Sequence, residues 1–263
     1  VICEQGSHVY RYEGGGIGFN SGASVRLIQG DRGRITAEQV LENLNNPDDP
    51  HLPLSRLVVA ENTANRGGGS CYELSGLEAI SKVCKEKGLG FHLDGARLFN
   101  ALIKTGITAE QIGRLFDTIS ICLSKGLGAP VGSVLIGDAD FIKKGVRIRK
   151  VFGGGMLQAG FIAAAGIYAL DHHIERLGED HHRARQIGKL LETCSFVKEV
   201  MPLETNIIIF TLQDDVKDND FLKKLKENNI LAVGFGKQTI RMVTHLDFTD
   251  EMLERLANHL GEL

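Results

Sequence analysis

The sequence predicts an α/β fold in which a mostly parallel sheet is flanked by helices. Short apolar runs with the length of buried strands alternate with longer segments of helical periodicity, which is typical of a parallel, doubly wound sheet. The chain has 263 residues, of which 43% are hydrophobic, enough to form a large core. Two of the apolar runs end in charged residues, and open α/β sheets gather their ligand-binding groups at such strand ends.

The first half of the chain supplies the strands and helices of this sheet. Thr36 is followed three residues later by Gln39, the capping-box pattern that starts a helix. Helices are therefore expected at 36–45 and, from the apolar periodicity, at 74–87. Strands are expected at 1–3, as an interior strand, at 25–29 and 57–61, through His92, through Leu123 and at 133–136.

The second half predicts a long helix followed by a smaller α/β unit. The helix begins beyond Gly160 and continues through Tyr168 towards Leu191. The smaller unit is expected to contain strands at 206–212 and 240–244 and helices at 218–228 and 250–260. We therefore expect a large domain at 1–170 and a small C-terminal domain at 171–263.

Two segments of the large domain place charged residues at the ends of apolar runs. They are Gly90-Phe-His-Leu-Asp-Gly-Ala-Arg97 and Ile119-Ser-Ile-Cys-Leu-Ser-Lys125-Gly-Leu-Gly-Ala-Pro-Val-Gly132. Pyridoxal phosphate needs a carboxylate beside its pyridine nitrogen and a lysine that holds its aldehyde as an imine. Asp94 and Lys125 are the candidates for these tasks. Gly126 and Gly128 would let the backbone turn sharply beside the cofactor.

Each of these residues has a simpler interpretation when taken alone. Asp94 could cap a helix that begins at Gly95, and Lys125 could be a solvated lysine in a loop. The joint placement of the two residues after two apolar runs favours the cofactor instead. Lysine becomes nucleophilic when burial or a neighbouring cation favours its neutral form, as in a cofactor site.

The sequence around these residues is long and specific enough to be compared with known families. It reads His-Leu-Asp-Gly-Ala-Arg-Leu-Phe-Asn-Ala at 92–101 and Leu-Ser-Lys-Gly-Leu-Gly-Ala-Pro-Val-Gly-Ser at 123–133. These motifs resemble those of the low-specificity L-threonine aldolases, which are fold type I enzymes dependent on pyridoxal phosphate within the aromatic amino acid β-lyase superfamily. Further segments similar to this family lie at 6–13, 59–63, 149–156 and 240–247.

The resemblance implies roles for five residues. Lys125 would form the Schiff base with pyridoxal phosphate, and Asp94 would pair with the pyridine nitrogen. Arg97 would lie near the ring hydroxyl and, together with Arg241, would hold the substrate carboxylate through paired, charge-assisted hydrogen bonds. His8 would stack on the pyridine ring and is the candidate base for the substrate hydroxyl.

This chain departs from the family pattern at two positions. Family members commonly carry a histidine where this chain has Ala64, so the hydroxyl proton would pass to His8, to a water or to a group from elsewhere. They usually carry an arginine that helps to hold the cofactor phosphate where this chain has Leu157. They also have an N-terminal loop whose amides bind that phosphate. We therefore expect this sequence to lack the family's N-terminal segment, as a fragment or a chain whose first part is missing.

The implied reaction is retro-aldol cleavage of L-threonine, L-allo-threonine and related β-hydroxy-α-amino acids to glycine and an aldehyde. Such a carbon–carbon lyase would serve threonine catabolism and glycine biosynthesis. The alternatives are another lyase of the same superfamily, acting by β-elimination or racemisation, and a non-catalytic scaffold. Because fold type I enzymes usually share active sites across a dimer interface, we expect a homodimer or homotetramer whose small-molecule partner is the amino acid substrate.

Composition argues against several other classes of protein. A formal net charge of −3 does not suit a nucleic-acid partner. No apolar run has the length of a membrane span, and no signal peptide begins the chain. The five cysteines are odd in number and form no C-x-x-C pair, which is typical of reduced thiols. We expect a cytoplasmic protein.

Two charged stretches are expected to lie on the surface. The histidines and acidic residues between 171 and 182 are interpreted as a solvated face, so no metal ion is expected there. The basic run at 143–150 is interpreted as an exposed helix, and a contact with a phosphate or a neighbouring subunit is the alternative. Its members are Lys143, Lys144, Arg147, Arg149 and Lys150.

Overall fold

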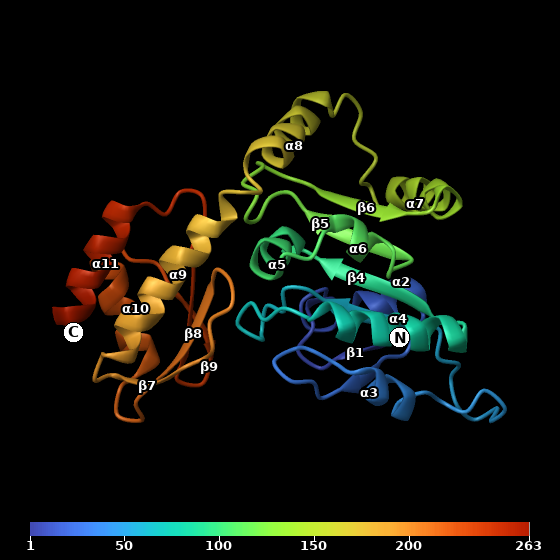
Figure 1. Cartoon of the computed structure of the whole chain (residues 1–263), viewed down its shortest axis with the longest axis horizontal. Coiled ribbons are helices and arrows are strands. Elements are labelled where there is room, and N and C mark those ends of the chain that lie inside the picture. Colours follow the sequence, from blue (N-terminus) through green and yellow to red (C-terminus); the bar gives the residue numbers. More distant parts are fainter. Residues whose placement is uncertain (263) are drawn as a thin grey trace. The chain divides into compact units, whose positions relative to one another are not determined.

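The computed structural model of the chain describes residues 1–262 and contains two compact units (Figure 1). The first unit is Val1–Ile174, and the second begins at Glu175. Within the described residues, no helix is both long enough and apolar enough to cross a membrane.

The first unit is built on a six-stranded sheet with the order β2-β1-β3-β4-β5-β6. The first five strands in this order run parallel, and β6 runs antiparallel to β5. The predicted, mostly parallel sheet is confirmed, including the interior position of the opening strand. The strands are β1 (Ile2–Glu4), β2 (Arg26–Ile28), β3 (Leu57–Glu61), β4 (Gly90–Gly95), β5 (Thr118–Cys122) and β6 (Ser133–Gly137).

Helices of the first unit connect and flank these strands. The predicted capping box is present at the start of α3, where the Thr36 hydroxyl accepts a hydrogen bond from the Gln39 amide and Gln39 Oε1 accepts one from the Thr36 amide. The helices are α1 (His8–Arg11), α2 (Gly16–Ser21), α3 (Ala37–Glu42), α4 (Leu74–Lys87), α5 (Leu98–Thr105), α6 (Ala109–Gly113), α7 (Ala139–Val151) and α8 (Gly160–His172).

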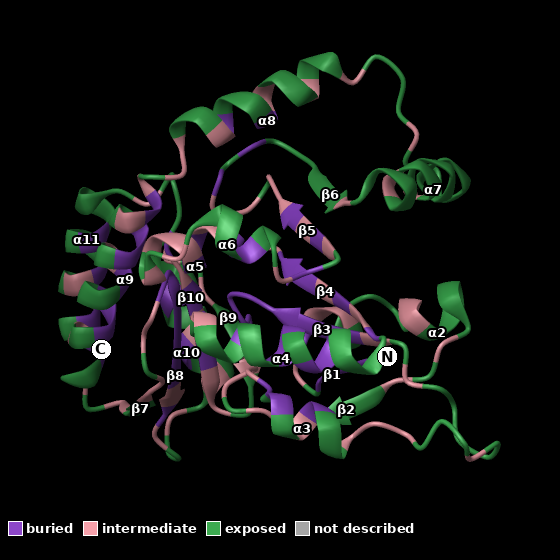
Figure 2. Cartoon of the chain, turned by 45° about the vertical axis from the view of Figure 1, so that its right-hand side comes forward, coloured by how far each residue is buried: buried purple, intermediate pink, exposed green. Residues whose placement is uncertain are grey.

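The core of the first unit lies around the central strands, which are mostly buried in Figure 2. Leu77 and Ile80 on α4 are fully buried, and so are Phe91 and Leu93 on β4. Burying each such side chain stabilises the fold by about 1.5–3 kcal/mol relative to its exposure. The core therefore fixes the central strands, and with them the positions of the residues at their ends.

The second unit contains a four-stranded antiparallel sheet with the order β7-β8-β10-β9. The elements of this unit are α9 (Leu177–Glu192), β7 (Val197–Val200), β8 (Ile207–Leu212), α10 (Asp218–Glu227), β9 (Val233–Gly236), β10 (Thr239–Val243) and α11 (Asp250–Glu262). The strand β8 is almost entirely buried and packs with apolar residues of the helices α9, α10 and α11.

The prediction of one long helix between Gly160 and Leu191 is wrong. The structure has two helices, α8 and α9, separated by residues 173–176. His173 Nδ1 lies 2.6 Å from the carbonyl oxygen of Leu127, and this contact fixes the end of α8. The sequence carries no proline or glycine at the break, so periodicity alone does not reveal it.

The predicted solvated face between 171 and 182 is also partly wrong. Asp180 and His181 on α9 are 0% and 3% exposed. Arg176 donates to both carboxylate oxygens of Asp180, at 3.1 and 2.5 Å, and this bidentate pair compensates the burial of the charge. By contrast, the basic run forms the helix α7, which has no buried residue and confirms the predicted exposure.

In the first unit, the turn that contains Arg32 is hydrogen-bonded to the loop that contains Gly67 and Ser70. The Arg32 side chain donates from Nε and Nη2 to the carbonyl oxygen of Gly67, at 3.1 and 3.0 Å. The Ser70 hydroxyl donates to the Arg32 carbonyl at 2.6 Å. A Cβ added at Gly67 would lie 1.9 Å from the Arg32 carbonyl oxygen, so only glycine allows this approach.

We expect Gly67→Ala to lower the free energy of unfolding by roughly 1–3 kcal/mol or more, because the overpacked backbone must shift. Gly76→Ala is the matched control, since Gly76 lies in α4 with nothing within 4 Å of the added methyl group. Alanine in place of a helical glycine should stabilise the protein by up to about 1 kcal/mol. Urea unfolding of both variants measures these changes, and equal stability of the two would contradict the interlocked turn.

Candidate active site

The carboxyl ends of the parallel strands meet at one edge of the first unit's sheet. Glu61, the last residue of β3, is in register with Asp94 of β4, and Asp94 is in register with Ser120 of β5. Register partners on neighbouring parallel strands point to the same face of the sheet. Two carboxylates therefore lie side by side at this edge, next to the strand that leads to Lys125.

Asp94 is 7% exposed, and its Oδ1 accepts a hydrogen bond from the Ala96 amide at 3.1 Å. Within residues 1–262, its second oxygen, Oδ2, accepts no hydrogen bond. The interpretation of Asp94 as a helix cap is wrong, because α5 begins at Leu98 with Arg97 as its N-cap residue. A buried carboxylate with one oxygen available suits a cationic partner such as a protonated pyridine nitrogen.

Lys125 lies in the loop that follows β5, and its side chain is half-buried. The loop is closed by hydrogen bonds from the Gly128 amide to the Lys125 carbonyl, 2.9 Å, and from the Leu123 amide to the Gly132 carbonyl, 3.0 Å. Gly128 and Gly132 have φ values of 72° and 118°, which favour glycine. The Lys125 amine makes no hydrogen bond or ion pair with the part of the chain that the structure describes.

His8 is the first residue of α1, and its side chain is 34% exposed. Its Nδ1 lies 2.9 Å from Glu13 Oε1, and its ring centroid lies 5.0 Å from that of Tyr12. The His8 amide donates to Glu61 Oε2 at 2.8 Å, which joins α1 to the end of β3. His8 therefore belongs to the same edge of the sheet as Asp94.

Glu61 is a residue of this edge that the sequence did not identify as functional. It is 6% exposed, and its Oε1 accepts a hydrogen bond from the Asn65 amide at 2.8 Å. Burial, reinforced by the charge of Asp94, raises the pKa of this carboxyl to about 7, although the amides of Asn65 and His8 and the charge of Arg97 oppose the rise. A charged residue at the end of a buried strand next to Asp94 was the available signal.

The remaining predicted site residues lie on different units. Arg97 is half-buried at the start of α5, close enough to Glu61 for its charge to lower the pKa of that carboxyl. Arg241 lies on β10 in the second unit, and its guanidinium carbon is 4.9 Å from the centroid of the Phe235 ring. The first unit thus gathers His8, Asp94, Arg97 and Lys125 around one sheet edge.

The two departures from the family pattern occupy different environments. Ala64 is 2% exposed and forms an isolated β-bridge with Ser70. Its Cβ would lie 2.5 Å from a Cβ added at Gly33, so this position is closely packed. Leu157 is 83% exposed between α7 and α8. Neither side chain can exchange a proton or bind a phosphate.

The chemistry of these residues fits the ring and aldehyde ends of pyridoxal phosphate. Asp94 offers a buried carboxylate with an available oxygen, and Lys125 offers an amine without a partner in residues 1–262. No group of three or more histidine, cysteine or acidic residues within the described chain could hold a metal ion.

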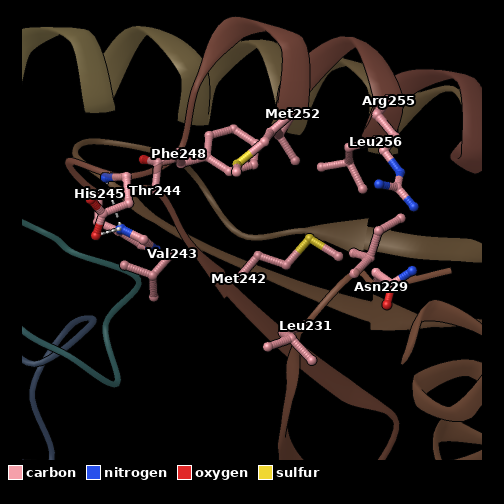
Figure 3. A pocket seen from close by; sticks show the side chains of 13 residues that line it. Asn229, Leu231, Met242, Val243, Thr244, His245, Phe248, Met252, Arg255 and Leu256 are labelled. Atoms are coloured by element: carbon pink, nitrogen blue, oxygen red, sulfur yellow. Dashed lines mark hydrogen bonds and ion pairs between the residues drawn. The ribbon is translucent and has the colours of Figure 1, made fainter. Parts of the chain in front are cut away.

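A separate cavity of about 370 Å³ lies in the second unit (Figure 3). In Figure 3, Met252 and Leu256 of α11 face the same space as Met242 of β10, and Arg255 lies at its edge. The lining is largely apolar and includes none of the residues predicted for the site. This cavity is therefore not the candidate active site.

Comparison with known families agrees with the geometry. The family model described as beta-eliminating lyase matches residues 1–215, which places the chain in that class of enzymes. The low-specificity L-threonine aldolase of Escherichia coli (strain K12) is 36% identical over 259 residues, covering 98% of this chain and 75% of the relative. Low-specificity L-threonine aldolase 1 of Arabidopsis thaliana is 34% identical over 254 residues, covering 95% and 71%. The chain belongs to the low-specificity L-threonine aldolase family.

Solved structures show the same fold. The threonine aldolase of Leishmania major matches with a TM-score of 0.83 and 24% sequence identity, covering 99% of this chain and 76% of that one. Plasmodium falciparum ornithine δ-aminotransferase matches with a TM-score of 0.62 and 16% identity, covering 90% and 60%. These likenesses confirm the predicted fold type I architecture, and the different activities in their names show that the fold alone does not define the reaction.

His92, two residues before Asp94 on β4, predicts a dependence of stability on pH. Its Nδ1 lies 2.7 Å from the Thr118 hydroxyl, and burial lowers its pKa below 6.5 despite the opposing charge of Asp94. A histidine with a lowered pKa binds fewer protons in the folded state than in the unfolded state. Its contribution to stability is present above pH 6.5 and is lost as the pH falls towards the pKa of the folded state.

We expect His92→Asn to flatten the loss of stability between pH 7 and pH 5, because asparagine does not titrate and can still bond to Thr118. His51→Asn, at an exposed loop position, is the control substitution. Urea unfolding at several pH values measures the slopes. Identical slopes for the parent protein and His92→Asn would show that His92 does not control acid stability.

Proposed function

We propose that this protein is an aldolase dependent on pyridoxal phosphate that cleaves L-threonine, L-allo-threonine and related β-hydroxy-α-amino acids to glycine and an aldehyde. The placement of Asp94 and the Lys125 loop on neighbouring strand ends is the observation that carries the proposal. Membership of the low-specificity L-threonine aldolase family supports the choice of reaction.

Pyridoxal phosphate, when bound, supplies an electron sink for the electron pair of the bond that breaks. Lys125 would hold the cofactor at its aldehyde carbon, and Asp94 Oδ2 would keep the pyridine nitrogen protonated. Arg97 and Arg241 would bind the substrate carboxylate with paired hydrogen bonds and so orient the Cα–Cβ bond for cleavage. The orientation of the bound substrate would thus select the Cα–Cβ bond as the one that breaks.

His8 is proposed to take the proton of the substrate hydroxyl. With Nδ1 2.9 Å from Glu13 Oε1, the favoured tautomer carries its proton on Nδ1 and donates a hydrogen bond to that carboxylate. Nε2 is then the basic nitrogen and can accept the hydroxyl proton as the Cα–Cβ bond opens. Ala64 has no side-chain group that can take a proton, so the proposal assigns this step to His8 or to a water that His8 orients.

β-Elimination is the second candidate reaction, and the match to the beta-eliminating lyase family favours it over racemisation. It would use the same lysine and aspartate and would release pyruvate from serine. A non-catalytic scaffold is the third candidate, supported by Ala64 and Leu157 in place of the histidine near the substrate hydroxyl and the arginine near the phosphate that family members commonly carry.

The protein is further proposed to be cytoplasmic, to serve glycine biosynthesis and threonine catabolism, and to assemble as a homodimer or homotetramer with active sites at the dimer interface. Exposed apolar residues on one strand and two helices of the first unit support an assembly. They include Val134, Leu135 and Ile136 of β6, Ile148 and Val151 of α7, and Phe161 and Ile167 of α8.

We expect the protein supplied with pyridoxal phosphate to convert L-threonine to glycine and acetaldehyde, and Lys125→Ala to reduce this activity to background. Asp94→Asn should lower kcat on the order of 10²–10³-fold, because it removes the charge partner of the electron sink. The exposed Lys104 provides a matched control, and Lys104→Ala should retain the parent activity. Chromatography of glycine and an enzymatic assay of acetaldehyde follow the reaction.

The same assay separates the rivals. Pyruvate from L-serine without glycine from L-threonine would replace the aldolase proposal by β-elimination. Borohydride reduction should attach the cofactor to Lys125, as mass spectrometry of the peptide would reveal. A protein that binds no pyridoxal phosphate under these conditions would support the scaffold instead.

A further inference from the structure

Glu61 connects three segments of the candidate site through one carboxylate. It ends β3, its Oε2 accepts the His8 amide of α1 at 2.8 Å, and its Oε1 accepts the Asn65 amide of the following loop at 2.8 Å. His8 and Glu61 are 53 residues apart in the sequence. Since α1 has no side-chain cap of its own, the Glu61 carboxylate takes that place at its first turn.

The surroundings of Glu61 make its charge state sensitive to the site. Asp94 lies in register on β4, and the Asn62 amide donates to the Asp94 carbonyl at 3.0 Å. Burial raises the pKa of Glu61, the charge of Asp94 adds to the rise, and the charge of Arg97 opposes it. Burial raises the pKa of Cys3 on β1 and of Tyr72 in the loop before α4, and the charge of Glu61 adds to the rise of both.

The two hydrogen bonds require the ionised form of Glu61 for full strength. A carboxylate accepts at both oxygens, and hydrogen bonds to a charged acceptor are about twice as strong as neutral ones. A protonated carboxyl keeps one good acceptor and adds a donor that needs its own partner. Protonation therefore weakens the link between β3, α1 and the Asn65 loop.

We propose that Glu61 is a positioning residue of the reaction, whose ionised carboxylate holds the backbone of His8 and thereby places the His8 imidazole at the end of the sheet. For the catalytic part of this role, the inference rests on the proposed function. Because the pKa of Glu61 is about 7, the hydrogen bond from the His8 amide to this carboxylate weakens as the pH falls through neutrality. In the proposed function Arg97 and Arg241 bind the substrate carboxylate, so kcat should fall with little change in KM.

Glu61 also couples cofactor binding to proton release. Burial is the main cause of the raised pKa of Glu61 and the charge of Asp94 adds to it, so a pyridinium ring paired with Asp94 would remove that added part. At pH 7, binding of pyridoxal phosphate should therefore expel part of a proton from Glu61. Any release of protons at Lys125 on binding should be equal in the parent protein and in a Glu61 variant, so the difference between them reports Glu61.

The principal test compares Glu61→Gln with Glu42→Gln, an exposed glutamate in α3, in the protein loaded with pyridoxal phosphate. Glutamine offers one acceptor and places an amide group against the second N–H donor. We expect Glu61→Gln to lower kcat at pH 8 about tenfold to a hundredfold, the scale of a misplaced catalytic group, with KM changed less than about threefold. Glu42→Gln should match the parent protein.

A double-mutant cycle shows whether Glu61 acts through His8. In a His8→Ala background, Glu61→Gln should have almost no further effect on kcat, because the group that it positions is already absent. Effects that multiply would overturn the proposal, as would an unchanged kcat in Glu61→Gln alone.

Two measurements test the inference without turnover. Calorimetry of pyridoxal phosphate binding at pH 7 in phosphate and in Tris buffer should show more protons released by the parent protein than by Glu61→Gln. In the unmodified protein, hydrogen exchange at the His8 amide, corrected for its intrinsic pH dependence, should be less protected at pH 6 than at pH 8. Equal proton release by the parent protein and a folded Glu61→Gln variant would overturn the coupling to the cofactor. Equal protection of the His8 amide at the two pH values would overturn the proposed link even if Glu61→Gln failed to fold.

These outcomes are separable from failure of the proposed function. If the parent protein lacks aldolase activity, the reaction assignment fails, while the proton-release and exchange measurements still decide whether Glu61 holds His8. If the parent is active and Glu61→Gln matches it, only the positioning role fails.

Discussion

The parallel register of the central strands is the constraint on which the rest of the first unit depends. Because β3, β4 and β5 run in the same direction, their carboxyl ends lie at one edge of the sheet. Glu61 and Asp94 become neighbours there, and the chain leaving β5 carries Lys125 from the adjacent strand end. A shift of one residue in either pairing would turn the carboxylates to the opposite face.

Burial of carboxylates at this edge is costly, and backbone amides offset the cost. Glu61 accepts two amide hydrogen bonds, and Glu4 at the end of β1 also accepts two, from Gly6 at 2.5 Å and from Gly30 at 3.4 Å. How far hydrogen bonds offset the cost of burial differs between Glu61, Glu4 and Asp94, because each carboxylate has different donors and charged neighbours. This edge combines a rigid apolar core with groups whose charge can respond to a ligand, which is the property an organic cofactor site requires.

The reaction is decided by residues at the strand ends, since other enzymes carry the same fold. A TM-score of 0.62 to an ornithine δ-aminotransferase shows that the architecture accommodates another activity. Besides the orientation of the Cα–Cβ bond, the proposed aldolase reaction needs a group that takes the hydroxyl proton. In this chain Ala64 is inert, so the proposed mechanism depends on His8 and on the residues that hold it, Glu13 and Glu61.

The sequence by itself determined the strands β3 to β6 and the capped helix α3, because these depend on short-range apolar patterns and local motifs. The same patterns predict Asp94 and Lys125 as site residues. Only the tertiary structure decided the break between α8 and α9, where His173 meets Leu127, and the burial of Asp180 against Arg176. It also decided the hydrogen bond from the His8 amide to the Glu61 carboxylate, which joins residues 53 positions apart in the sequence. Contacts between distant segments leave no periodic signal in the chain, since their free energy arises only when the fold brings the partners together.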